Sequence, residues 1–288
     1  MNTKLLTLYK SKWADLCQAL QPIIDDDNFK IKPTCPLLIA VDDEEEYKNA
    51  DIRLMIFGQE TNNYFELFNP NIDKVLSYYD EYFLSGDWEL DTKRAFWQGL
   101  KPFITAIKSK YPNKKIAFIW NNIIKIGKLN EKGTPPDYIY NIEKKYFSVV
   151  KEEINILKPN MILFFTGPNY DNKLIDNFGA LKLNKISSLP ESELASLELL
   201  DISNVFRTYH PMGAKFFGKE YIDKCFTAII ENTNFDDPTK FQLHSLNTLQ
   251  EMLTKTIREK ETAIKNQDFE MAALLRKKQN LISKILQS

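Results

Sequence analysis

Residues 53–60 read Arg-Leu-Met-Ile-Phe-Gly-Gln-Glu, an apolar run that ends in a glycine, an amide and a carboxylate. A short, nearly continuous apolar run of this kind predicts a strand, Arg53–Phe57, that is buried on both faces of a sheet. Three further runs share this character, so we expect a core of four buried strands, the others being Ile116–Trp120, Met161–Phe165 and roughly Leu199–Tyr209.

Helical patterns separate these strands. Apolar residues recur at helical spacing in Ala95–Tyr111 and Tyr138–Leu157. Alternation of buried strands with helices predicts the α/β class, as a three-layer α/β/α arrangement around a central, mostly parallel four-stranded sheet. Pro36–Val41 is a candidate edge strand, and the acidic run Asp42–Glu46 is expected to be a solvated loop.

Composition excludes several classes of protein. The chain has 288 residues and net charge −1, and no apolar run approaches the roughly 20 residues that span a bilayer. The first residues lack a secretory signal pattern, so we expect no membrane association. Cysteines 17, 35 and 225 are odd in number and far apart, which favours a reducing cytoplasm. Three cysteines and two histidines predict neither a zinc site nor an iron–sulfur cluster, and we expect no metal or cofactor.

Polar residues follow each predicted strand. They are Gly58-Gln59-Glu60, Asn121 with Asn122, Thr166-Gly167, and His210-Pro211-Met212-Gly213. Ligands of open parallel sheets bind outside the carboxyl ends of the strands, although ordinary turns also favour these residue types. The sequence has no phosphate loop, no dinucleotide motif and no nucleophile elbow. A carboxylate, amides and a histidine remain, which suits recognition of a nucleobase and cleavage of a glycosidic bond.

These motifs resemble, in order, those of the uracil-DNA glycosylase superfamily over residues 50–230. The resemblance implies that a base is flipped out of DNA and that its N-glycosidic bond is hydrolysed, which leaves an abasic site. It assigns the catalytic roles to Glu60, which would steady the sugar cation and position water, and to His210, which would hydrogen-bond O2 of the departing base. It assigns base binding to Gln59, Asn62 and Asn121, with Phe65 or Phe68 as a stacking partner or, equally, as a core residue.

Two departures from that family's pattern concern the substrate. Glu60 stands where the family has Asp, and Asn62 stands where the uracil-specific branch has a Tyr that excludes 5-substituted pyrimidines. The base is therefore expected to be uracil or a 5-modified pyrimidine of foreign, phage-type DNA. Such an enzyme would act in DNA repair or in antiviral defence.

DNA contact is expected from the loops around these motifs. The candidates are Gly167, Met212, Lys215 and Phe216, where Phe216 and Phe217 either wedge into the duplex or begin a buried helix. Because the body is mildly acidic, phosphate binding must come from local lysines rather than from overall charge. Lysines 125, 128, 173, 215 and 219 are candidates, unless they are simply solvated side chains.

The last part of the chain differs from the body. Residues 1–235 form the predicted glycosylase-like domain, 232–243 a linker, and 244–288 a basic helical hairpin in which Asp268 caps the second helix. The string Asp268–Arg276 resembles the UVR motif of the repair proteins UvrB and UvrC, which implies association with a protein partner or with itself, unless the hairpin folds back on its own body. Two other functions stay open: a non-catalytic DNA-binding and recruitment module, and a hydrolase of free nucleosides.

Overall fold

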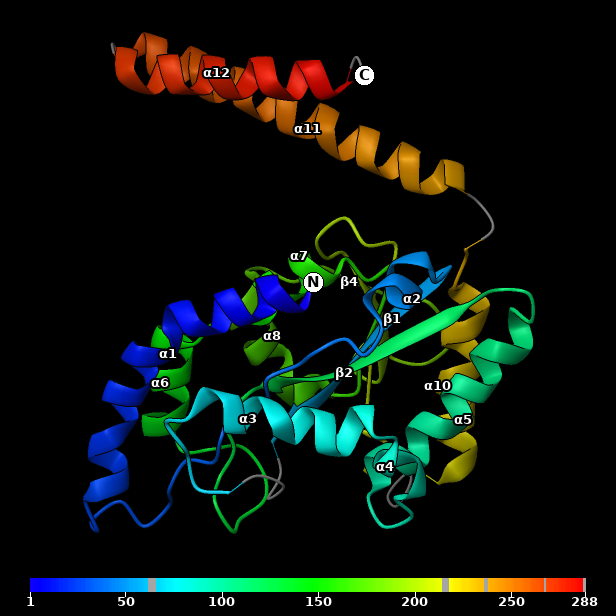
Figure 1. Ribbon diagram of the computed structural model, residues 1–288. Coiled ribbons are helices and arrows are strands. Elements are labelled where there is room, and N and C mark those ends of the chain that lie inside the picture. The colour runs from blue at the N-terminus through cyan, green and yellow to red at the C-terminus, as the bar shows by residue number, and fades with distance from the viewer. Residues whose placement is uncertain (62–65, 214–217, 236–237, 267, 287–288) are drawn as a thin grey trace. The chain divides into compact units, whose positions relative to one another are not determined.

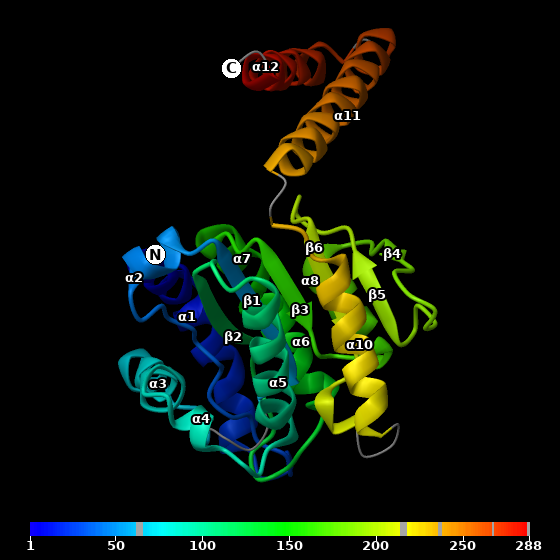
Figure 2. The same cartoon turned by 90° about the vertical axis from the view of Figure 1, so that its right-hand side faces the viewer.

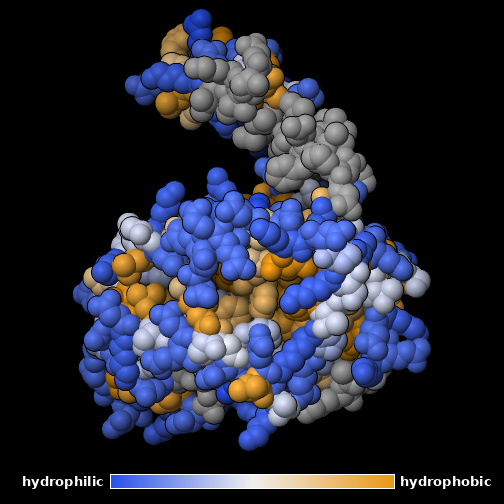
Figure 3. Space-filling model, turned by 45° about the vertical axis from the view of Figure 1, so that its right-hand side comes forward, coloured by the Kyte–Doolittle hydropathy of each residue, from blue (hydrophilic) through white to orange (hydrophobic). Residues whose placement is uncertain are grey.

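The computed structural model describes residues 1–61, 66–213, 218–235, 238–266 and 268–286. The chain divides into two compact units, Met1–Thr233 and Asn234–Ser288. Across the described residues, no helix is both long and apolar enough to cross a membrane. On the side of the body drawn in Figure 3, hydrophilic side chains dominate and hydrophobic ones form separate patches.

A six-stranded sheet in the order β2-β1-β3-β6-β5-β4 forms the centre of the body (Figures 1 and 2). The first four of these strands are parallel, which confirms the expected core, and β5 and β4 add to it in antiparallel fashion. The expected total of four strands is wrong because β4 and β5 are too short to give an alternating pattern. The strands are β1 (Ile52–Glu60), β2 (Ile116–Ile124), β3 (Met161–Phe164), β4 (Leu183–Asn184), β5 (Leu194–Leu197) and β6 (Asn204–Thr208).

Two of the strands extend further than their apolar runs. β1 continues through Gly58 to Glu60 and β2 continues to Ile124, so the polar residues expected in loops belong to strand ends. Pro36–Val41 is extended but is not a strand; the Leu37 N–H donates to the Lys125 carbonyl (2.9 Å) before this segment leaves β2.

Helices cover both faces of the sheet (Figures 1 and 2). One face carries α5 (Ala95–Lys110) and α10 (Lys219–Asn232). The other carries α1 (Asn2–Asp25), α6 (Asp137–Tyr146), α7 (Val150–Leu157) and α8 (Asp171–Phe178). The remaining elements of the body are α2 (Glu44–Asn49), α3 (Ile72–Tyr79), the π-helical η1 (Asp80–Leu84), α4 (Asp87–Leu90), and the 3₁₀ turns η2 (Pro168–Tyr170) and η3 (Pro211–Gly213).

Three helical expectations meet different outcomes. The helix expected at Ala95–Tyr111 is confirmed as α5. The single helix expected at Tyr138–Leu157 is wrong, because the chain turns at residues 147–149 and buries both Phe147 and Val149. The acidic run is only partly a loop, since the Asp43 carboxylate accepts the N–H groups of Glu45 and Glu46 and begins α2.

The second unit is a helical hairpin of α11 (Pro238–Lys265) and α12 (Phe269–Leu286). The Asp268 carboxylate accepts the N–H of Met271 (3.0 Å), which confirms the expected cap. α11 begins earlier than the predicted position 244, because proline is well suited to the first helical position. The linker is therefore shorter than expected.

A buried polar network joins β2 to the helices behind it. The Lys125 ammonium lies 2.8 Å from the Glu153 carboxylate of α7, and both side chains are fully buried. Glu153 also accepts the Tyr9 hydroxyl of α1 (2.6 Å) and the Asn121 amide of β2 (2.8 Å). Burial lowers the pKa of Lys125, and the charge of Glu153 opposes that shift. The nearby carboxylate of Glu143, in α6, accepts the N–H groups of Lys125 (2.8 Å) and Ile126 (2.9 Å) at the end of β2.

We expect Lys125→Met to destabilise the body strongly, because it leaves the Glu153 charge buried without its cation. The expected loss is about 3–5 kcal/mol in the free energy of unfolding, measured in urea. Adding Glu153→Gln should restore part of the loss, since the unpaired charge is then gone. The control Lys48→Met removes an exposed ion pair with Glu45 and should leave stability nearly unchanged. Equal stability of Lys125→Met and the native chain would contradict the proposed role of the network.

Candidate functional site

The candidate site lies where the chain leaves neighbouring strands toward opposite faces of the sheet. β1 and β3 are paired in parallel, yet β1 leads through α3, η1 and α4 to α5 on one face, whereas β3 leads to α8 on the other. In open α/β sheets, ligands usually bind at such a divergence, outside the carboxyl ends of the strands.

Glu60 supplies a buried carboxylate at the end of β1. Its side chain is only 7% exposed, and it accepts a hydrogen bond from the Tyr170 hydroxyl. The Tyr170 oxygen is also 2.9 Å from the Thr134 hydroxyl, which therefore acts as its donor. Burial raises the pKa of Glu60, whereas the Tyr170 hydrogen bond and the charge of Lys128 oppose the rise. Tyr170 thus fixes the carboxylate and stabilises its ionised form.

Gln59 and Gly58 connect the end of β1 to its neighbours. The Gln59 amide donates to the Thr166 carbonyl beyond β3 (2.8 Å). A Cβ placed on Gly58 would lie 2.5 Å from the Asn122 side-chain oxygen and 3.4 Å from the Phe96 ring. Only glycine therefore allows Asn122 to approach β1 this closely.

Strand register separates the two asparagines of β2. Phe57 pairs with Asn121 and Gly58 pairs with Asn122, and residues paired in a parallel ladder share a face. The Asn121 side chain is fully buried and is bonded to Glu153 and Lys125, on the face of α1 and α7. The structure therefore brings Asn122, and not Asn121, to the face of Gly58 and Phe96.

His210 follows β6 on that same face. Its ring centroid lies 5.8 Å from that of Phe96. Nδ1 accepts the N–H of Met212 (3.0 Å), so the neutral imidazole carries its proton on Nε2. Burial lowers the pKa of His210 to about 4, which keeps the ring neutral near pH 7. The result is a neutral hydrogen-bond donor at the strand ends.

Other predicted site residues lie elsewhere or are already bonded. Phe68 is in the core, with its ring centroid 5.7 Å from that of Trp13, so of its two predicted roles the structure supports the core role. The Gly167 N–H donates to the Thr208 carbonyl (3.0 Å), and Met212 is 45% exposed. The expectation that Lys125 contacts phosphate is wrong because its ammonium is fully buried. The predicted residues Asn62, Phe65, Lys215 and Phe216 lie outside the described residues.

The sequence prediction assigns no role to three residues of this site. Tyr170 holds Glu60, and Phe96 lies near both Gly58 and His210. Asn122 was available as the second member of the Asn-Asn pair, but the choice between the two depends on register. No local signal marks Phe96, which enters the site from the first turn of α5.

The hairpin has a packed interior and exposed apolar side chains. Ala263 and Ile282 are buried between the helices, and Lys260 donates to the Gln279 side chain (2.6 Å). Phe269 and Leu274 are 70% and 60% exposed. Residues 250–285 match the UVR family model, the UvrB/uvrC motif. No curated protein matches the chain.

We expect Gly99→Ala to disturb the position of His210. A Cβ at Gly99, in α5, would lie 2.2 Å from Cβ of Pro211, so helix and turn must separate. The expected cost is about 1–3 kcal/mol of stability, together with a changed His210 imidazole signal in NMR spectra. Lys108→Ala, on the exposed side of α5, should change neither quantity. Native stability with an unchanged His210 signal in Gly99→Ala would refute the close contact.

Proposed function

We propose that the body is a DNA glycosylase that accepts a flipped-out pyrimidine at the carboxyl ends of β1, β2 and β6. The observation that carries this proposal is that Phe96 lies near both the neutral His210 and Gly58, and that Gly58, two residues before Glu60, pairs with Asn122. A neutral donor, an amide and a buried carboxylate are the groups that base departure requires.

Each group has a distinct role in the proposed reaction. The Asn122 amide pairs with the Watson–Crick edge of the base, in place of the Asn121 first predicted. The Nε2–H of His210 donates to O2, which gains negative charge as the bond between base and sugar breaks. Glu60, held by Tyr170, stabilises the sugar cation and orients water, whose oxygen bonds to the sugar while its proton leaves with the base.

The proposed substrate class is a 5-substituted pyrimidine in DNA. Support comes from the sequence, in which Asn62 occupies the place of the Tyr that crowds the 5-position in the uracil-specific branch. A wider pocket accepts uracil as well as bulkier bases, and preference for the latter suits antiviral defence.

We expect the native chain to release bases from DNA, and Glu60→Gln or His210→Ala to lose at least about a hundredfold in rate. When activity is expressed per folded molecule, Asn122→Ala should lose more of it than Asn121→Ala, because only Asn122 faces the site. Abasic sites and released bases are measured on duplexes that contain uracil, thymine or 5-hydroxymethylated pyrimidines.

The matched control is Glu220→Gln, which removes a carboxylate that is 86% exposed and should leave the rate unchanged. DNA affinity of each variant, measured in parallel, separates lost chemistry from lost binding. Absence of release by the native chain from every duplex contradicts the enzyme, and release of uracil alone contradicts the modified-base proposal.

A second candidate function is recruitment of a partner through the hairpin, without catalysis. The exposed apolar side chains Phe269 and Leu274, together with the UVR match, favour this candidate. The UVR motif points to protein interaction or DNA binding. Recruitment by the hairpin and catalysis by the body are compatible in one chain.

We expect Phe269→Ser with Leu274→Ser to abolish association that the native chain shows, since it removes exposed apolar surface without touching the buried Ile282. Light scattering of the full chain, alone and with candidate repair proteins, measures this association. The control Glu270→Gln changes an exposed residue between these positions and should associate normally. Unchanged association of the double variant would place the contact elsewhere.

A further inference from the structure

The outer edge of β2 has main-chain groups that the sheet does not use. The Ile52 N–H donates to the Lys115 carbonyl. This register directs the main-chain N–H and C=O groups of residues 117 and 119 toward β1. Ile116, Phe118 and Trp120 therefore direct their N–H and C=O groups away from the sheet, since these directions alternate along a strand. The Tyr79 hydroxyl donates to the Trp120 carbonyl (2.9 Å). Among the described residues, Ile116 and Phe118 have no such outer partner.

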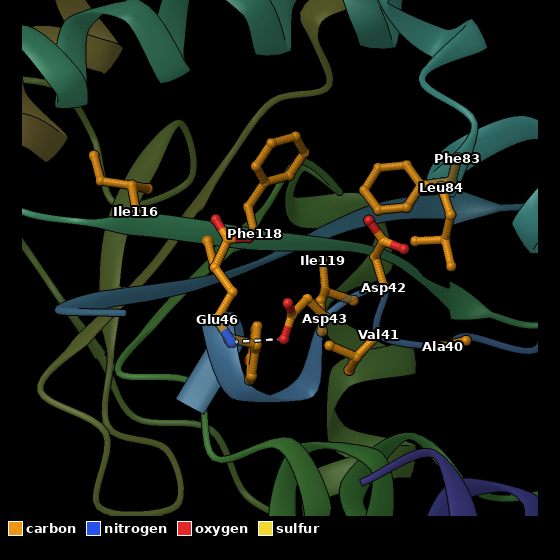
Figure 4. Close-up of a pocket in the computed structure, with 12 residues that line it drawn as sticks. Ala40, Val41, Asp42, Asp43, Glu46, Phe83, Leu84, Ile116, Phe118 and Ile119 are labelled. Atoms are coloured by element: carbon orange, nitrogen blue, oxygen red, sulfur yellow. Dashed lines mark hydrogen bonds between the residues drawn. The ribbon is translucent and has the colours of Figure 1, made fainter. Parts of the chain in front are cut away.

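A cavity of about 210 Å³ lies against this free edge. Figure 4 shows its lining: β2 with Ile116 and Phe118, the segment before α2 with Val41 and Asp42, and Phe83 and Leu84 beyond. The segment that contacts the end of β2 at Leu37 no longer runs beside the strand at this point, and its departure opens the space. The cavity therefore combines free main-chain groups with an apolar wall.

Carboxylates form the rim of this cavity. Asp42 and Glu46 are exposed, and no described cation pairs with either. Asp43, beside them, is engaged as the cap of α2. Burial raises the pKa of Asp80, and the charges of Asp42 and Glu81 add to that rise, so further carboxylates lie near this rim.

We propose that this edge is a docking site for an extended, basic peptide segment, which adds to the sheet beside Ile116 and Phe118. Main-chain hydrogen bonds to a free edge give affinity, and alternate side chains give specificity. Lysine or arginine side chains of the segment pair with Asp42 and Glu46, and an apolar side chain faces Val41, Phe83 and Leu84. Edge-to-edge pairing of two copies of this chain would bring two acidic rims together, so the charge favours a basic partner segment over a second copy.

The probe is a short fluorescent peptide that alternates lysine with valine, titrated into the full chain at low salt. We expect saturable binding and at least about tenfold slower hydrogen exchange at the amides of Ile116 and Phe118. A peptide that alternates glutamate with valine should not bind, and methylation of the lysine peptide's main-chain nitrogens should abolish binding without any change to the protein.

The double variant Asp42→Asn with Glu46→Gln should weaken binding about tenfold. Asp43 is left in place because it caps α2. The control Glu152→Gln removes one exposed charge from α7 and should bind normally. The proposal is overturned if the lysine peptide does not bind, or if the acidic or methylated peptide binds equally well. It is also overturned if hydrogen exchange slows only at amides other than those of Ile116 and Phe118. Because no readout involves base release, failure here is distinct from failure of the glycosylase proposal.

Discussion

The ion pair between Lys125 and Glu153 determines how the site end of β2 is held. Two opposite charges that are buried away from water must stay together, because separating them leaves a buried charge without a counter-ion. Asn121 and Tyr9 complete the hydrogen bonding of Glu153, so β2, α7 and α1 share one set of contacts. This constraint turns Asn121 toward α7, and strand alternation then places Asn122 on the opposite face, beside Gly58 and Phe96.

Much of the architecture could be predicted from local patterns. The four parallel strands follow from apolar runs, α5 from its helical spacing, and the cap at Asp268 from one side chain at a helix start. Each of these signals is carried by a short stretch of consecutive residues. The ends of strands as candidate ligand positions also follow, because parallel strands share a direction.

The rest depends on contacts between distant segments. The register of β2 on β1 decides which asparagine faces Phe96, and no property of Asn121 or Asn122 alone reveals it. Tyr170 reaches Glu60 across 110 positions of sequence. The break between α6 and α7 has no glycine or proline; it exists because Phe147 packs on Tyr9 and Trp13.

The position of α1 in the sequence has a consequence for the protein during its synthesis. Tyr9 and its hydrogen-bond partner Glu153 are 144 positions apart. At about 5–20 residues per second, the ribosome takes on the order of ten seconds to deliver that partner after the helix has emerged. Until α6 and α7 are made, the apolar stripe of α1, with Leu5, Trp13 and Leu16, is only partly covered, for example by Phe68 on Trp13, so apolar surface stays exposed on the nascent chain.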